Sequence, residues 1–190
     1  MHGIAAISQR MTEIETMMGL GARPAAAATG NAVRFDAVLD AAIATTGARP
    51  TTDVRSADGV PVALAVYGNG KVPASALETV GTTGHRMWGP AAQQLEQLMA
   101  AAAREGVTIG ITDSYRSFDA QVDVAQRKGL YTQGGLAAEP GTSPHGWGIA
   151  VDLDLDAQAQ TWMRANAGRF GYVEDTPREP WHWVHRGGLI

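Results

Sequence analysis

Residues 143–152 read SPHGWGIAVD, and near the C-terminal end residues 179–182 read EPWH. Together the two stretches contribute two imidazoles and two carboxylates: His145, Asp152, Glu179 and His182. A hydrolytic zinc site needs three protein ligands, a fourth position open to water and a nearby carboxylate that takes a proton. These stretches therefore contain the side chains that such a site requires.

The residues around Asp152 predict a β-strand. Over residues 149–156, Ile, Val and Leu alternate with Ala and Asp. A period of two is typical of a strand with one apolar and one polar face, so we expect Asp152 to point away from the core. His145 comes just before this strand in a glycine-rich turn, which can bend its imidazole back toward Asp152.

A second short strand is predicted at residues 181–184, which read WHWV. Antiparallel pairing of the two strands would place His182 across from Asp152, with the Cβ atoms about 5 Å apart. Glu179 precedes this strand, and Pro180 keeps its backbone extended. Residues that are distant in the sequence are thus expected to form one site.

The pattern S-x-H-x-x-G-x-A-x-D followed by E-x-W-H resembles the zinc D,D-peptidases of bacterial cell walls, the VanY and VanX type. That family includes D-Ala-D-Ala carboxypeptidases and dipeptidases, and the L-alanyl-D-glutamate endopeptidases of phage lysins. The resemblance runs from about Gly59 to the C-terminus and includes residues 114–117, SYRS. It implies a mainly antiparallel sheet flanked by helices, which the zinc D,D-peptidases share with hedgehog-like folds.

The resemblance also implies roles for individual residues. His145, Asp152 and His182 would bind one Zn²⁺ ion, Glu179 would be the general base, and Arg116 would stabilise the oxyanion. Ser143 is expected to bind a substrate carboxylate or a ligand, and Gln121 and Tyr115 to line the cleft.

Each role has a structural alternative. In the alternative, the histidines only satisfy hydrogen bonds and Asp152 is a solvated strand residue. Glu179 could be a surface glutamate beside Arg178, and Arg116 could form a salt bridge with Asp113 or Asp119. His185 competes with His182 as a ligand.

The expected activity is zinc-dependent hydrolysis of an amide bond in the peptidoglycan stem peptide. Carboxypeptidase and endopeptidase remain open, because no residue shows whether the cleft closes around a terminal carboxylate. A non-catalytic, metal-containing wall-binding or structural module is the alternative from another class. Such modules usually lack the base, whereas Glu179 is present here.

The chain is expected to be α+β, with residues 1–58 forming a helical leader and linker and residues 59–190 the catalytic domain. Short strands are predicted at 62–66, 107–111 and 170–173. Helices are predicted to begin near Pro90, after Ser117 and after Asp156, because Pro suits a first turn and Ser and Asp are good caps.

Apolar residues near the N-terminus are spaced three and four apart: Ile4, Ile7, Met11, Ile14 and Met18. They predict a short helix within residues 1–20 that packs on another surface, or a docking or self-association helix. A phage or flagellar assembly would be one such partner.

Composition excludes several classes of protein. The net charge is −4 and no basic cluster indicates nucleic-acid binding. No apolar run reaches the length of about 20 residues that crosses a membrane, and the absence of Cys excludes disulfides and thiolate metal ligands. The N-terminus does not resemble a signal peptide, although an extracytoplasmic, cell-wall location is expected.

Overall fold

The structure is a computed structural model that describes residues 52–187. In chain order its elements are η1 (Val62–Leu64), η2 (Ala74–Ala76), β1 (Glu78–Thr79), β2 (Arg86–Met87), α3 (Gly89–Arg104), β3 (Gly110–Asp113), α4 (Phe118–Lys128), η3 (Tyr131–Gln133), η4 (Pro144–Trp147), β4 (Ala150–Asp154), α5 (Ala157–Asn166), η5 (Ala167–Phe170), β5 (Tyr172–Val173) and β6 (His182–His185). The architecture is α+β with antiparallel sheets, as the sequence predicts.

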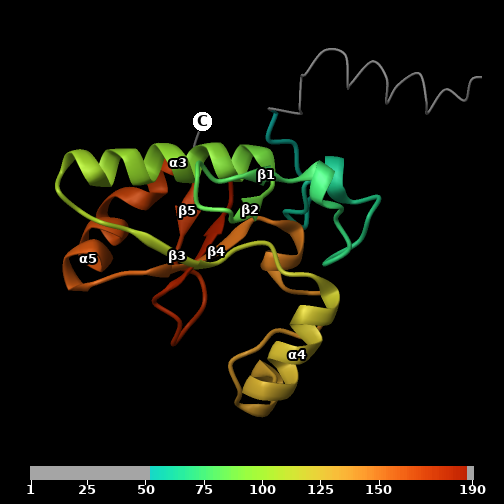
Figure 1. Cartoon of the computed structure of the whole chain (residues 1–190). Helices are drawn as coiled ribbons and strands as arrows, with labels where there is room; N and C mark the ends of the chain where they lie inside the picture. The colour runs from blue at the N-terminus through green and yellow to red at the C-terminus, as the bar shows by residue number, and fades with distance from the viewer. Residues whose placement is uncertain (1–51, 188–190) are drawn as a thin grey trace, which may run out of the picture. The chain divides into compact units, whose positions relative to one another are not determined.

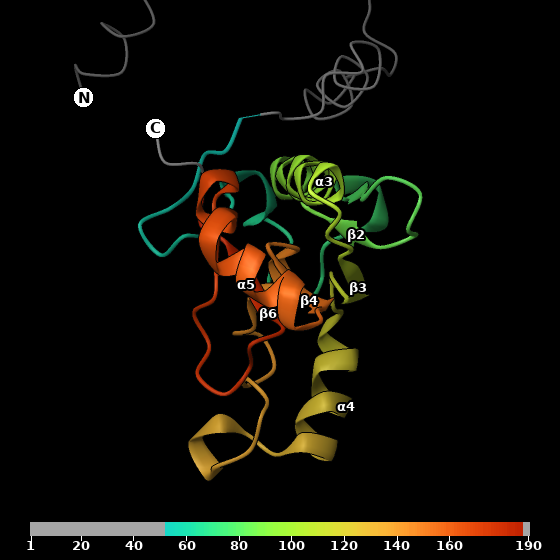
Figure 2. The ribbon, with the colours of Figure 1, turned by 90° about the vertical axis from the view of Figure 1, so that its left-hand side faces the viewer.

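The main sheet has the strand order β3-β4-β6-β5, and every neighbouring pair is antiparallel. Strands β1 and β2 form a separate two-stranded sheet. Helices α3 and α5 lie beside the main sheet, whereas α4 projects away from it (Figures 1 and 2). The loop that follows α4 returns the chain to η4 and β4.

One core joins the main sheet to α3 and α5. Helix α3 contributes Leu95, Leu98 and Ala102, which are fully buried and lie three and four residues apart. Strand β4 buries Val151 and Leu153 on the same side. Because side chains alternate along a strand, this burial turns Asp152 toward the opposite face.

The predicted helix starts are confirmed. The Ser117 hydroxyl accepts a hydrogen bond from the Ala120 amide, and an Asp156 carboxylate oxygen accepts one from the Ala159 amide. These side chains satisfy amides that have no partner within the helix. Pro90 lies in the first turn of α3, where its missing N–H removes no helical bond.

Two strand predictions need correction. Residues 62–66 contain the 3₁₀ helix η1 rather than a strand, and both Val62 and Val66 are exposed. Without a neighbouring strand, alternating apolar residues do not form a sheet. Strand β3 begins only at Gly110, although Val107 and Ile109 are buried as expected.

Arg55 attaches residues before the predicted domain boundary to the main sheet. Its guanidinium donates to the His185 carbonyl oxygen at 2.9 Å, and a second nitrogen lies 2.7 Å from His185 Nδ1. It also pairs with Asp53 at 2.6 Å and stacks on Trp88, 4.9 Å from the ring centroid. The division at residues 58 and 59 stays a prediction, but Arg55 already packs on β6.

Within residues 52–187, no helix combines the length and apolar character that crossing a membrane requires. The helix expected within residues 1–20 lies outside the described residues. The docking or self-association role of residues 1–20 therefore stays a prediction.

We predict that Arg55→Ala lowers the free energy of unfolding by about 2–3 kcal/mol, because it leaves buried partners without their charged donor. Arg127→Ala is a matched control, since its salt bridge with Asp123 is exposed and contributes about 0.5 kcal/mol or less. Urea unfolding of both variants measures the difference. Equal decreases in the free energy of unfolding would show that the contacts of Arg55 with β6 do not stabilise the fold.

Candidate metal centre and active site

The pairing of β4 with β6 places Asp152 directly opposite His182, as the sequence predicts. Helix η4 brings in His145 from just before β4. The three donor atoms form a small triangle: His182 Nδ1 lies 3.0 Å and His145 Nε2 3.3 Å from Asp152 Oδ1, and the two nitrogens are 3.1 Å apart. These residues are the group that could hold a metal ion in the described chain.

The triangle fits a small divalent cation. Tetrahedral ligands about 2.0–2.2 Å from zinc lie about 3.3–3.6 Å from one another, close to the separations found here. Imidazole nitrogen and carboxylate oxygen are also ligands that zinc favours. The cleft beside them encloses about 60 Å³, which leaves room for an ion and a water molecule.

Backbone contacts fix the His145 ring. Its Nδ1 lies 2.6 Å from the Ser114 carbonyl oxygen, which can only accept a hydrogen bond, so Nδ1 carries the proton and Nε2 is free to bind a metal. The flanking glycines permit this packing. A Cβ on Gly146 would approach Asn69 Oδ1 to 2.1 Å, and Gly148 has φ 64° with the Trp88 amide close by.

Asp152 is stabilised as a carboxylate. Burial by itself would raise the pKa of Asp152, but the imidazoles of His145 and His182, when protonated, outweigh it through hydrogen bonds and positive charge and hold that pKa well below its usual range. Arg116 adds a further cation, with Nη2 3.4 Å from Asp152 Oδ2. The site thus supplies an ionised oxygen as one corner of the triangle.

Arg116 also forms the salt bridge with Asp113 that the sequence left open. Its Nε donates to Asp113 at 2.9 Å and its Nη1 to Gln121 Oε1 at 2.8 Å. Because a bulge in β3 aligns Asp113 with Asp152, the guanidinium lies between two carboxylates that would otherwise repel each other. Arg116 therefore organises this side of the site besides any role toward substrate.

Glu179 is buried, with 5% of its surface exposed, and lines the same cleft as the triangle. The Tyr131 hydroxyl donates to its Oε2 at 2.9 Å. Burial and the neighbouring Glu179 raise the pKa of Tyr131, so the phenol stays protonated. The reading of Glu179 as a surface residue is therefore not supported.

The predicted substrate-binding residues occupy different places. Ser143 is buried and lines the cleft. Gln121 is buried outside the cleft lining; its Oε1 accepts a hydrogen bond from Arg116 and its Nε2 donates one to the Ala138 carbonyl oxygen. Tyr115 packs against the core and is not among the cleft-lining residues of the described chain. The substrate roles of all three stay predictions.

His185 lies apart from the triangle. It is three residues from His182 in the same strand, and an odd separation directs the two side chains to opposite faces. Burial, and then the charge of Arg55, lower the pKa of His185 to about 4, so its ring is neutral near pH 7. In this structure its Nδ1 contacts Arg55 and not the triangle.

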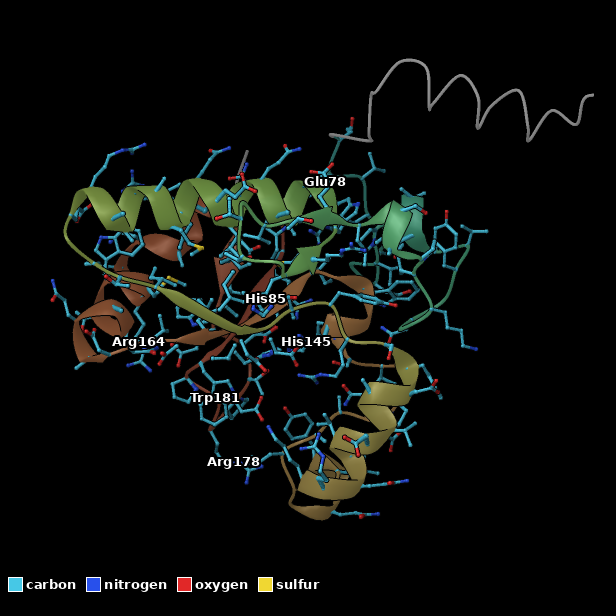
Figure 3. The ribbon with its side chains drawn as sticks, in the orientation of Figure 1. Glu78, His85, His145, Arg164, Arg178 and Trp181 are labelled. Atoms are coloured by element: carbon cyan, nitrogen blue, oxygen red, sulfur yellow. The ribbon has the colours of Figure 1, made fainter. Side chains whose placement is uncertain are left out.

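The cleft residues that the sequence analysis missed include two with polar side chains, Tyr131 and Lys128. Lys128 ends α4, and Tyr131 begins the 3₁₀ helix η3 in the loop that follows. Both lie in or beside a glycine-rich stretch without strong periodicity, and neither belongs to the two motifs. The view with side chains shows His145 near the middle of the domain, with Trp181 and Arg178 on the loop that leads to β6 (Figure 3).

Comparison with known proteins identifies the family of the chain. The family model described as VanY, D-alanyl-D-alanine carboxypeptidase, matches residues 84–188, more than half of the chain. The chain belongs to this family. Both motifs and the SYRS segment lie inside the match.

A D-alanyl-D-alanine carboxypeptidase of Enterococcus faecalis is 30% identical over 122 residues, which is 49% of this chain and 46% of that protein. The chain thus spans about half the length of this curated relative.

Two solved structures share the fold. VanYB in complex with D-alanine-D-alanine is 27% identical, with a TM-score of 0.52 over 60% of this chain and 81% of that one. A mutant of the vancomycin-resistance D,D-pentapeptidase VanY in complex with Zn(II) is 26% identical, with a TM-score of 0.51 over 60% and 82%.

We predict that Asp152→Asn weakens zinc binding at least about 100-fold, because it removes an anionic ligand. Asp154→Asn is the matched control, since Asp154 is an exposed aspartate in the same strand. Zinc should raise the melting temperature of the control as it does that of the unchanged protein, but not that of Asp152→Asn. Thermal unfolding and elemental analysis measure both effects, and equal zinc content in the two variants would contradict the site.

Proposed function

We propose that this protein is a zinc-dependent carboxypeptidase that removes the terminal D-alanine from peptidoglycan stem peptides ending in D-Ala-D-Ala. The observation that carries the proposal is the convergence of His145, Asp152 and His182, with Glu179 in the same cleft. Membership of the family and the complexes of its relatives with Zn(II) and D-alanine-D-alanine support the metal and the substrate.

Zinc bound by the triangle would polarise the peptide carbonyl and acidify a water molecule. Glu179 takes the proton from the attacking water and passes it to the nitrogen of the departing D-alanine. Its burial beside the triangle suits this role, because proton transfer from the attacking water to the leaving nitrogen then takes place away from bulk water.

Arg116 supplies positive charge toward the developing oxyanion while holding Asp152 in place. Ser143 lies in the cleft wall, where its hydroxyl can donate to a carboxylate of the peptide. Gln121 orients Arg116, and Tyr115 supports the wall from the core side. All of these are roles that we assign to the proposed enzyme.

Lys128 favours a carboxypeptidase over an endopeptidase. It lines the cleft, and no ion pair or hydrogen bond joins its ammonium group to another described residue. Arg116, by contrast, already pairs with Asp113, Gln121 and Asp152. A free α-carboxylate is present at the end of a carboxypeptidase substrate, and Lys128 can pair with it.

The substrate implies action at the cell wall. Attachment through residues 1–20 to a partner, such as a phage or flagellar structure, would change where the enzyme acts and not its chemistry.

We predict that the zinc-loaded protein releases D-alanine from a muropeptide ending in D-Ala-D-Ala, and that a chelator stops the reaction. Glu179→Gln should bind zinc with unchanged stoichiometry and lose about 10²–10⁴-fold in kcat, because it cannot take a proton. Glu139→Gln, an exposed glutamate outside the cleft, is the control. Mass spectrometry of the products identifies the cleaved bond.

Activity that persists after complete zinc removal would exclude the metal mechanism. Products cut within the stem would indicate an endopeptidase, and no products at all would indicate the non-catalytic module. A Glu179→Gln variant as active as the unchanged protein would reject the assigned base.

We predict that Lys128→Met lowers kcat/KM about 3- to 10-fold on a peptide with a free terminal carboxylate, mainly through KM. The same peptide with a C-terminal amide should be hydrolysed equally by both proteins, because it offers no charge to Lys128. Lys71→Met is the control, since Lys71 stacks on Phe118 away from the cleft. Equal decreases in kcat/KM on both peptides would show that Lys128 does not bind the terminal carboxylate.

A further inference from the structure

Glu179 has an unusual environment for a carboxylate. It is almost completely buried, yet Tyr131 is the one hydrogen-bond donor to its side chain among residues 52–187. Buried carboxylates normally accept several hydrogen bonds, because each unsatisfied oxygen loses the hydration it has in water. The orientation of Glu179 therefore depends on a single phenol.

Tyr131 comes from a loop that is distant from Glu179 in the sequence and belongs to neither motif. The loop closes on itself, since the Tyr131 amide donates to the Ala137 carbonyl at 2.8 Å and the Gly135 amide to the Leu130 carbonyl at 2.8 Å. A closed loop of this kind presents its side chains in a defined direction.

Side chains on both sides of the cleft hold this loop in place. Gln121 donates to the Ala138 carbonyl at 2.8 Å, and Arg178 donates to the Gly135 carbonyl at 3.0 Å. Figure 3 shows Arg178 beside the loop that follows α4. The loop therefore bridges α4, which orients Arg116, and the segment that carries Glu179.

The backbone next to Glu179 supports the same arrangement. Arg178 has φ 71° and is the non-glycine residue with a positive φ in the described chain. The left-handed region disfavours residues that carry a Cβ, so surrounding contacts must maintain it. The bond from Arg178 to Gly135 is such a contact.

We propose that Tyr131 is a positioning residue for the general base: its hydroxyl fixes Oε2 of Glu179 and leaves Oε1 to take the proton. This inference rests on the proposed function, in which Glu179 is that base. The phenol is suited to the task because burial and the neighbouring Glu179 raise the pKa of Tyr131, so its hydroxyl keeps the proton that it donates.

Tyr131→Phe removes the hydroxyl and keeps the ring. We expect kcat to fall about 10- to 50-fold, with KM changed less than about 3-fold and zinc content unchanged, because a freely rotating Glu179 is seldom aligned. Tyr67→Phe, an exposed tyrosine outside the cleft, is the control and should keep full activity.

The double variant separates positioning from a direct role. If Tyr131 acts through Glu179, Tyr131→Phe should cause no further loss in a Glu179→Gln background. An equal fractional loss in both backgrounds would overturn the inference, and so would a Tyr131→Phe enzyme with unchanged kcat.

A second measurement does not depend on turnover. In crystals of the metal-free Tyr131→Phe protein we expect the Glu179 carboxylate to leave its position or to adopt more than one conformation. A carboxylate that stays in place would overturn the inference even if the protein is an active carboxypeptidase. If the unchanged protein instead shows no hydrolysis, the proposed function fails, and the catalytic purpose of the contact fails with it.

Discussion

The antiparallel pairing of β4 with β6 is the constraint on which the site depends. It aligns Asp152 with His182 on one face, while Val151 and Trp183 pair on the buried face. A slip of one residue would turn Asp152 into the core and expose apolar side chains, so burial fixes the register. The hydrophobic effect thereby determines the distance between two candidate metal ligands.

Pairing of charged side chains also supports the aligned strands. Three acidic or basic groups meet at the edge of the sheet, where Arg116 lies between Asp113 and Asp152. Burying an isolated charge costs free energy, and here the guanidinium of Arg116 offsets that cost by pairing with both carboxylates. The arrangement keeps an anionic oxygen available for a cation while the surrounding backbone holds His145 in the tautomer that can bind it.

The opposite face of β6 is held by residues outside the family match. Arg55 precedes residue 84, where that match begins, yet it binds His185 at the end of the strand that carries His182. Stability of the site therefore depends on a segment that the motifs do not reveal. The loop carrying Tyr131 also belongs to neither motif, although it lies within the family match, and its hydroxyl donates to Glu179 from the far wall of the cleft.

The sequence by itself determined the features that follow from local patterns: the alternation around Asp152, the caps at Ser117 and Asp156, and the two motifs that contain the ligand triangle. Only the tertiary structure decided which distant groups meet. It placed a 3₁₀ helix at Val62–Leu64 instead of a strand, directed His185 away from the triangle, and joined Tyr131 to Glu179 and Arg55 to β6. The physical reason is that period and capping act over a few neighbouring residues, whereas burial and pairing of polar side chains depend on the whole packed chain.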